Sequence, residues 1–205
     1  MTVFRFQKPL IESYLIPYRE KSSNGLKCYQ SIRNASRILA IEISDRLPYH
    51  DYYLDTITRN GIRTHILGED ILLVVKIRSG IAMFESFSDV LNTSKAAFLG
   101  VNRDNDNIVC STVPKLSYNN TVIVLDPLIA TGRTINLIVE YLVSQGINEK
   151  YIQIASLICS EKGIKEIETA HPFVTINAGI VTEALDSNAG VHPHIGDIGD
   201  RMFRS

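Results

Sequence analysis

Apolar residues recur with two different periods along this chain of 205 residues. Five short runs are almost continuously apolar and rich in β-branched residues, which is typical of strands that are buried on both faces of a sheet. The runs are ILLVVKI, AAFLGV, TVIVL, IQIASLI and TINAGIV, and they begin at residues 71, 96, 121, 152 and 175. They predict the strands of one central sheet.

Other segments repeat apolar residues at helical spacing. After the TVIVL run, apolar residues follow the i, i+3, i+4, i+7 pattern, and Gly146 is expected to end this helix. Similar spacing occurs at two earlier places in the chain. The three stripes are Ile135, Ile138, Val139 and Leu142; Ile32, Ala35, Leu39 and Ile43; and Phe84, Phe87, Val90 and Leu91.

Strand and helix patterns alternate from about Ile71 onward. This order predicts an α/β protein with a central, mostly parallel sheet, helices on both faces and right-handed connections. A chain of this length is within the range of one large domain, so we expect residues 1–205 to form a single domain.

The segment between Val101 and Thr121 is polar and rich in turn-forming residues. It is too long for a simple connection between two elements. We therefore expect a β-arm here that either folds over a site or reaches a partner subunit.

The junction at residues 125–134, with the sequence LDPLIATGRT, carries the clearest chemistry. A loop that leaves a buried strand and opens a helix presents unpaired backbone N–H groups and the positive end of the helix dipole, which together bind phosphate. Asp126 is placed to hold either ribose hydroxyls or a magnesium ion. The loop as a whole suits a phosphorylated sugar, although such a junction is often only a turn. The chain has neither GxxxxGK[ST] nor GxGxxG after a strand, which counts against ATP hydrolysis and dinucleotide redox chemistry.

Four motifs in fixed order resemble those of the uracil phosphoribosyltransferases, which are type I phosphoribosyltransferases. DPLIATG at 126–132 resembles the loop that binds 5-phosphoribosyl 1-diphosphate (PRPP). IRSG at 77–80 resembles the family's L-R-A-G loop, and LGVNRD at 99–104 resembles its G-x-Y-R-N-E segment. GDIGDR at 196–201 resembles its carboxyl-terminal G-D-x-G-D-R signature. The resemblance covers nearly the whole chain.

This resemblance implies a type I phosphoribosyltransferase fold with a β-arm and a C-terminal base-binding loop region. It also implies transfer of the phosphoribosyl group of PRPP to uracil, which gives UMP and pyrophosphate. Arg78, Asp126 and Asp197 would be the catalytic residues. Those that bind PRPP would be Arg78, Arg103, Asp126, Pro127, Leu128, Ile129, Ala130, Thr131, Gly132, Arg133, Thr134 and Asp197, and those that bind the base would be Val191, Gly196, Asp197 and Ile198.

The arginines also have simpler interpretations. Arg78 could form a structural ion pair instead of binding pyrophosphate, although a cation at the end of an apolar strand favours an anionic ligand. Arg103 could be a solvated surface residue. Arg133, which stands where the uracil enzymes have a second glycine, could point into solvent or add charge to the phosphate loop.

Departures from the family pattern leave two alternatives open. Thr182, Gly190 and His194 each differ from the family's residues near the base, and Arg133 differs in the phosphate loop. The chain could therefore be a phosphoribosyltransferase for another base. It could also be a non-catalytic regulator that binds PRPP or a nucleotide.

The family implies Mg²⁺ bound with PRPP, a homodimer or larger homo-oligomer, and GTP as an effector in some members. A net charge of −1 creates no overall field that would attract nucleic acid. No apolar stretch approaches the roughly 20 residues that cross a bilayer, and no signal-peptide core is present, so we expect no membrane partner.

Cysteine and histidine positions do not indicate a metal site. Cys28, Cys110 and Cys159 are scattered, without a CxxC pair, which favours a reducing cytoplasm over a disulfide framework or a zinc site. His192 and His194 lie close together but have no third ligand at suitable spacing. We expect no metal bound by the protein itself.

Overall fold

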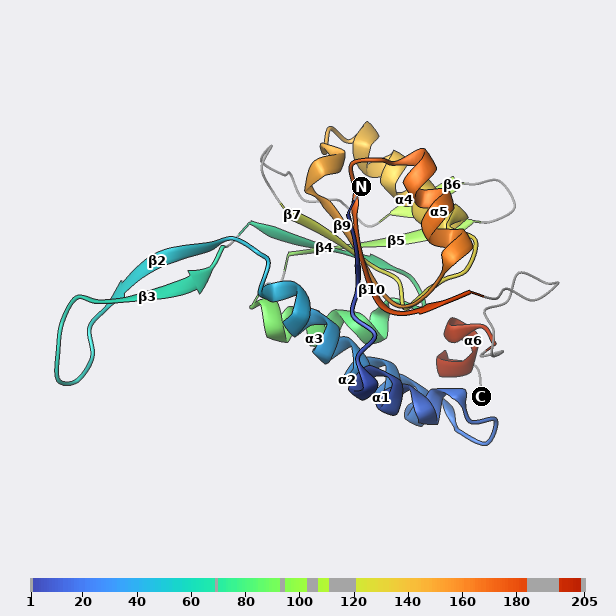
Figure 1. The fold of residues 1–205 in the computed structure, drawn as a ribbon, viewed down its shortest axis with the longest axis horizontal. Helices are drawn as coiled ribbons and strands as arrows, with labels where there is room; N and C mark the ends of the chain where they lie inside the picture. Colours follow the sequence, from blue (N-terminus) through green and yellow to red (C-terminus); the bar gives the residue numbers. More distant parts are fainter. Residues whose placement is uncertain are drawn as a thin grey trace.

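The computed structural model describes residues 2–68, 70–92, 95–102, 107–110, 121–183 and 196–203. Within these residues the centre is an eight-stranded sheet in the order β1-β10-β9-β7-β4-β5-β6, and β8 pairs with β9 beside this path (Figure 1). All neighbouring strands of this central sheet are parallel except β5 and β6, which are antiparallel. The strands are β1 (Thr2–Arg5), β4 (Ile71–Lys76), β5 (Ala96–Asn102), β6 (Asn107–Cys110), β7 (Thr121–Leu125), β8 (Leu128–Ile129), β9 (Ile152–Ser160) and β10 (Thr175–Thr182).

Helices cover both faces of this sheet, as the sequence predicts (Figure 1). Two lie on one face and four on the other, and a short 3-10 helix, η1 (Glu149–Tyr151), comes directly before β9 in the chain. The first face has α4 (Arg133–Ser144) and α5 (Glu161–Ala170), and the second has α1 (Pro9–Arg19), α2 (Gly25–Ser44), α3 (Ile81–Leu91) and α6 (Ile198–Phe203).

The two cores explain why the predicted strands are apolar without alternation. Leu73 and Val75 of β4 pack into the core beneath α1, α2 and α3. Leu72 and Val74 of the same strand pack into the core beneath α4 and α5. Since successive side chains of a strand point to opposite faces, a sheet covered on both sides requires apolar residues at every position. All five predicted strands are confirmed.

The three predicted helices are also confirmed. Their apolar stripes supply buried residues of α2, α3 and α4. Helix α4 ends at Ser144, and Gly146 follows with φ of +88°. This left-handed conformation is open to glycine at little cost, so the predicted stop has the expected physical cause.

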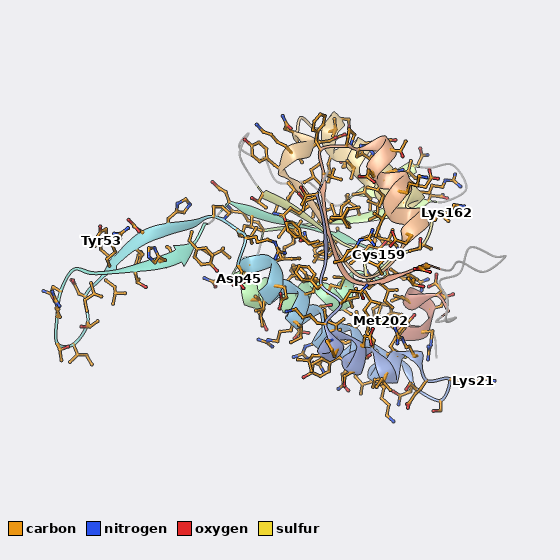
Figure 2. All side chains as sticks on the ribbon, viewed as in Figure 1. Lys21, Asp45, Tyr53, Cys159, Lys162 and Met202 are labelled. Carbon is orange, nitrogen blue, oxygen red and sulfur yellow. The ribbon has the colours of Figure 1, made fainter. Side chains whose placement is uncertain are left out.

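An arm that the sequence did not indicate projects from the sheet. It is the antiparallel hairpin of β2 (Tyr49–Leu54) and β3 (Ile62–Leu67), which extends away from the sheet, with Tyr53 on it (Figures 1 and 2). Between Val101 and Thr121 the described strand β6 pairs with β5 at the edge of the sheet, whereas 103–106 and 111–120 lie outside the described residues. Strand β2 has no buried residue, so the buried-strand pattern did not reveal the hairpin.

No helix in the described ranges combines the length and the apolar character that a bilayer crossing requires.

Candidate functional site

A cleft of about 800 Å³ lies at the carboxyl ends of β4, β5 and β7. This is the edge where open parallel sheets bind ligands. Eleven of the predicted site residues line it, and they come from the loop after β4, from the segment between β7 and α4, from the start of α4 and from the C-terminal segment. They are Arg78, Asp126, Leu128, Ile129, Ala130, Thr131, Gly132, Arg133, Thr134, Asp197 and Ile198.

The other four predicted site residues are not among the described residues that line the cleft. Pro127 and Gly196 are described but do not line the cleft. The Pro127 carbonyl accepts a hydrogen bond from Ile158 N at 3.1 Å, so this residue fastens the loop to β9. Arg103 and Val191 lie outside the described residues.

The junction after β7 has the predicted order of strand, loop and helix. Its middle contains an unpredicted short strand, β8, in which Leu128 pairs with Ile158 and Ile129 with Cys159. The chain then turns through Gly132, which has φ of +79°, and α4 begins at Arg133. The backbone N–H groups of the first helical turn have no partner within the helix and lie at the cleft, which suits an anion.

Helix α5 holds the loop at residues 126–132 in place through Ser160, its N-cap residue. The Ser160 hydroxyl donates to the Ala130 carbonyl and accepts from Gly163 N at 2.8 Å. A Cβ on Gly163 would lie 2.6 Å from the Ala130 oxygen, and a Cβ on Gly132 would lie 2.9 Å from the Gly163 oxygen. Two backbones are thus in direct contact, and this contact ties the loop to the start of α5.

A second loop, residues 77–80 after β4, packs against the end of β7. Gly80 N donates to the Lys76 carbonyl at 2.7 Å, and the Ile77–Arg78 peptide bond is cis. A Cβ on Gly80 would lie only 2.4 Å from the Leu125 oxygen. Glycine at this position therefore lets the loop that carries Arg78 approach the residue just before Asp126.

Asp126 lies between these two loops. It is 2% exposed, and its Oδ1 accepts hydrogen bonds from Ser79 Oγ at 3.0 Å and from Lys76 Nζ at 3.4 Å. The Lys76 ammonium also donates to Ser79 Oγ at 2.8 Å. Lys76 was not among the predicted site residues. The signal that could have found it is a lysine that ends an otherwise apolar strand, two residues before Arg78.

Arg78 reaches across the cleft to the C-terminal signature. Its Nη2 donates to Asp200 Oδ1 at 2.8 Å, and both side chains are partly exposed. Asp197 Oδ1 accepts from Asp200 N at 2.9 Å, at the start of α6. The structure thus brings all four sequence motifs to one cleft, since Gly100, Val101 and Asn102 of the LGVNRD motif also line it.

Arg201 and Tyr18 fasten this signature to the end of α1. Arg201 donates to the carbonyls of Tyr18 and Glu20, and its guanidinium lies 5.0 Å from the centre of the Tyr18 ring. The Tyr18 hydroxyl donates to the Gly196 carbonyl at 3.4 Å. Burial raises the pKa of the Tyr18 phenol well above its usual value, and nearby Arg201 opposes this only in part, so the hydroxyl stays protonated and can donate.

No cysteine nucleophile emerges from the described part of the site. Cys159 on β9 is fully buried next to the phosphate loop, and burial raises the pKa of its thiol to about 12. A thiol in this state is a poor nucleophile at neutral pH. Among the described residues, no three His, Cys, Asp or Glu side chains come together in a way that could hold a metal ion.

Replacement of Gly163 by alanine should destabilise the protein, because the new Cβ would overlap the Ala130 oxygen. At an exposed helix position, alanine normally stabilises the folded protein relative to glycine. A loss of stability in Gly163→Ala would therefore identify the close contact between Gly163 and the Ala130 oxygen. We expect Gly163→Ala to lower the free energy of unfolding by about 1–3 kcal/mol. Urea unfolding followed by circular dichroism measures this. A change no larger than that of the control Glu168→Ala, on the exposed side of α5, would contradict close packing here.

Comparison with known proteins gives the same assignment as the motifs. The family model described as "Uracil phosphoribosyltransferase" matches residues 5–205. The uracil phosphoribosyltransferases of Limosilactobacillus reuteri and Pediococcus pentosaceus are 25% and 27% identical over 199 residues, which cover 95% of this chain and 94% of each relative.

Solved structures share the fold. The AQ2163 protein from Aquifex aeolicus superposes with a TM-score of 0.86 at 24% identity, with 98% of both chains covered. An adenine phosphoribosyl transferase from Trypanosoma brucei superposes with a TM-score of 0.57 at 15% identity, over 94% of this chain and 89% of that one. The predicted type I phosphoribosyltransferase fold is therefore confirmed. With a family match over 5–205 and its motifs gathered at one cleft, the chain belongs to the uracil phosphoribosyltransferase family.

Proposed function

We propose that this chain transfers the 5-phosphoribosyl group of PRPP to uracil, giving UMP and pyrophosphate in pyrimidine salvage. The observation that carries the proposal is the convergence of the phosphate loop, the Arg78 loop and the C-terminal signature on one cleft. A phosphate, a ribose with a diphosphate and a base need three neighbouring recognition elements. The family match supports uracil as the base.

The 5-phosphate of PRPP would bind at residues 130–134. The loop there opens α4, a helix of 12 residues, and lines the cleft. Backbone N–H groups at such a helix start bind phosphate oxygens, and the dipole of the helix favours the negative charge. Arg133 at the first position of α4 adds a cation to the same lining.

Arg78 would bind the diphosphate that leaves. In the structure it pairs with Asp200, but the two side chains are 49% and 39% exposed. An ion pair that is so exposed to water contributes only about 0–1 kcal/mol to stability. A diphosphate with several charged oxygens can therefore replace Asp200 as the partner of Arg78. Arg103 would add to this charge according to the family pattern.

Asp126 would hold the ribose hydroxyls rather than a metal ion. Its Oδ1 is already in contact with the Lys76 ammonium, and a second cation on the same carboxylate would be repelled. We therefore assign Mg²⁺ to the PRPP itself, where it would offset the charge of the diphosphate oxygens. The chain's own residues then position the ribose between the phosphate loop and the Arg78 loop.

The base would lie over the C-terminal segment. We propose that Asp197 orients PRPP while backbone groups of Gly196, Ile198 and Val191 contact uracil. A ring nitrogen of uracil attacks the anomeric carbon as the bond to diphosphate breaks, and the proton that this nitrogen carried is released to diphosphate or water. Because positive charge develops on the ribose and negative charge on the leaving group, positioning and fixed charges supply the catalysis.

We further propose that the protein forms a homodimer through the β2–β3 hairpin and acts in the cytoplasm. The hairpin carries large exposed side chains, with Tyr53 at 64% and Ile57 at its tip fully exposed, and it extends away from the sheet (Figure 2). Such side chains are more often found where a partner covers them. The cysteines Cys28 and Cys159 are free, which suits a reducing compartment. GTP as an effector stays a prediction.

Purified protein with PRPP and Mg²⁺ should release pyrophosphate with uracil and with no other base of a panel that contains cytosine, hypoxanthine, adenine and orotate. Pyrophosphate release and the nucleotide product are measured together. Release with a different base would instead identify a phosphoribosyltransferase of changed specificity. Saturable binding of PRPP or UMP without any release would identify a non-catalytic regulator.

Asp126→Asn should leave the fold intact and lower kcat/KM with uracil and PRPP by about 10²-fold. The asparagine carbonyl can still accept from Ser79 and Lys76, whereas the charge that faces the ribose is lost. Steady-state kinetics measure the effect. Asp89→Asn on α3, whose carboxylate is 55% exposed, is the matched control and should keep full activity. An Asp126→Asn enzyme of wild-type efficiency would refute the ribose assignment.

The double variant Tyr52→Glu and Tyr53→Glu should convert the proposed dimer into a monomer, because two charges would be buried in the interface. Light scattering after size-exclusion chromatography gives the mass. Phe173→Glu, at another residue with an exposed ring, is the control and should leave the dimer unchanged. A monomeric wild-type protein would contradict the proposed role of the hairpin.

A further inference from the structure

A lysine lines the cleft, at the end of a strand that is otherwise apolar. Residues 71–75 of β4 are apolar and buried, and Lys76 follows them. The Lys76 side chain is only 15% exposed and lines the cleft together with Arg78 and Asp126. Burial of an ammonium group is costly unless it is paired, so its partners show why it can be there.

These partners form a closed triangle. The Lys76 ammonium donates to Ser79 Oγ at 2.8 Å and to Asp126 Oδ1 at 3.4 Å, and the Ser79 hydroxyl donates to the same Oδ1 at 3.0 Å. Both contacts to Asp126 fall on Oδ1. An ammonium has three N–H groups, so one remains beyond these two contacts. The triangle therefore fixes the carboxylate and leaves the cation at the edge of the cleft.

Lys76 also changes the charge of the cleft. Among the described lining residues, three cations face three carboxylates: Lys76, Arg78 and Arg133 against Asp126, Asp197 and Asp200. Without Lys76, the carboxylates would outnumber the cations by one, in a cleft proposed to bind a ligand with several negative charges. Ser79 stands where the family's L-R-A-G pattern has alanine, so the hydroxyl of the triangle is a departure of this chain.

We propose that Lys76 positions Asp126 and supplies, from within the protein, part of the positive charge that binds the diphosphate of PRPP. The diphosphate is attached to the anomeric carbon, next to the ribose 2-hydroxyl. A carboxylate that holds the ribose hydroxyls consequently brings the diphosphate toward the ammonium beside it. The inference rests on the proposed function. Its consequence is that PRPP binding to the wild-type protein should depend less on Mg²⁺ than PRPP binding to a variant that lacks the Lys76 ammonium.

Calorimetric titration with PRPP, in excess Mg²⁺ and in EDTA, tests this. Lys76→Met keeps the length of the side chain and removes the charge. We expect the loss of affinity on removal of Mg²⁺ to be about tenfold larger for Lys76→Met than for the wild type, since a charge-assisted hydrogen bond contributes about this much. Lys76→Arg should restore most of the difference, because it restores the cation.

Two further variants keep the test decisive. Lys95→Met removes an ammonium that is 48% exposed and pairs with Asp70, just before β5 begins, and should behave as the wild type. Ser79→Ala removes one side of the triangle and should increase the Mg²⁺ dependence by a smaller factor, about two- to fivefold. If Lys76→Met fails to fold by circular dichroism, the Ser79→Ala titration decides the question.

Equal Mg²⁺ dependence of Lys76→Met and the wild type would overturn the inference and identify Lys76 as part of a structural ion pair. A wild-type protein that binds no PRPP even in excess Mg²⁺ would instead refute the proposed function. The two failures are distinct, because the first requires that the wild type binds PRPP.

Discussion

Direct contact between backbones at the ends of the parallel strands is the constraint on which this site depends. Gly80 lies against the carbonyl of Leu125, and Gly163 lies against the carbonyl of Ala130, at distances that leave no room for a side chain. The first contact joins the loop of Arg78 to the end of β7, and the second joins the phosphate loop to α5. Both contacts fix loops of the cleft to strands and helices of the core, and binding elements that are held in this way lose less conformational entropy when a ligand binds.

The charged side chains of the site differ in how far they are exposed to water. Arg78 and Asp200 form an exposed pair that a ligand can separate, whereas Asp126 is buried and held by Ser79 and Lys76. Exposed ion pairs contribute little to stability, while buried groups depend on their partners. The site thus combines an arginine in an exposed ion pair with a buried carboxylate that two neighbouring side chains hold.

The sequence predicted five strands of the sheet, three helices and the order of strand, loop and helix at 121–144, because each depends on a local pattern. Buried parallel strands are apolar throughout, and the loop at 126–134 has a distinct composition. The β2–β3 hairpin was missed because strand β2 buries none of its residues, so it lacks a buried face that alternation could show. Lys76 was missed for another reason: its partners Ser79 and Asp126 come from two loops, and only the packing of β4 against β7 brings them together. Base contacts could be predicted only through the family's motif, since they depend on loop backbone.

A crystal structure with UMP bound tests the central claim most directly. We expect the phosphate to accept hydrogen bonds from backbone N–H groups of residues 130–134 and the ribose hydroxyls to lie within hydrogen-bond distance of Asp126. A complex in which this loop contacts no phosphate, with the nucleotide bound elsewhere on the protein, would contradict the account.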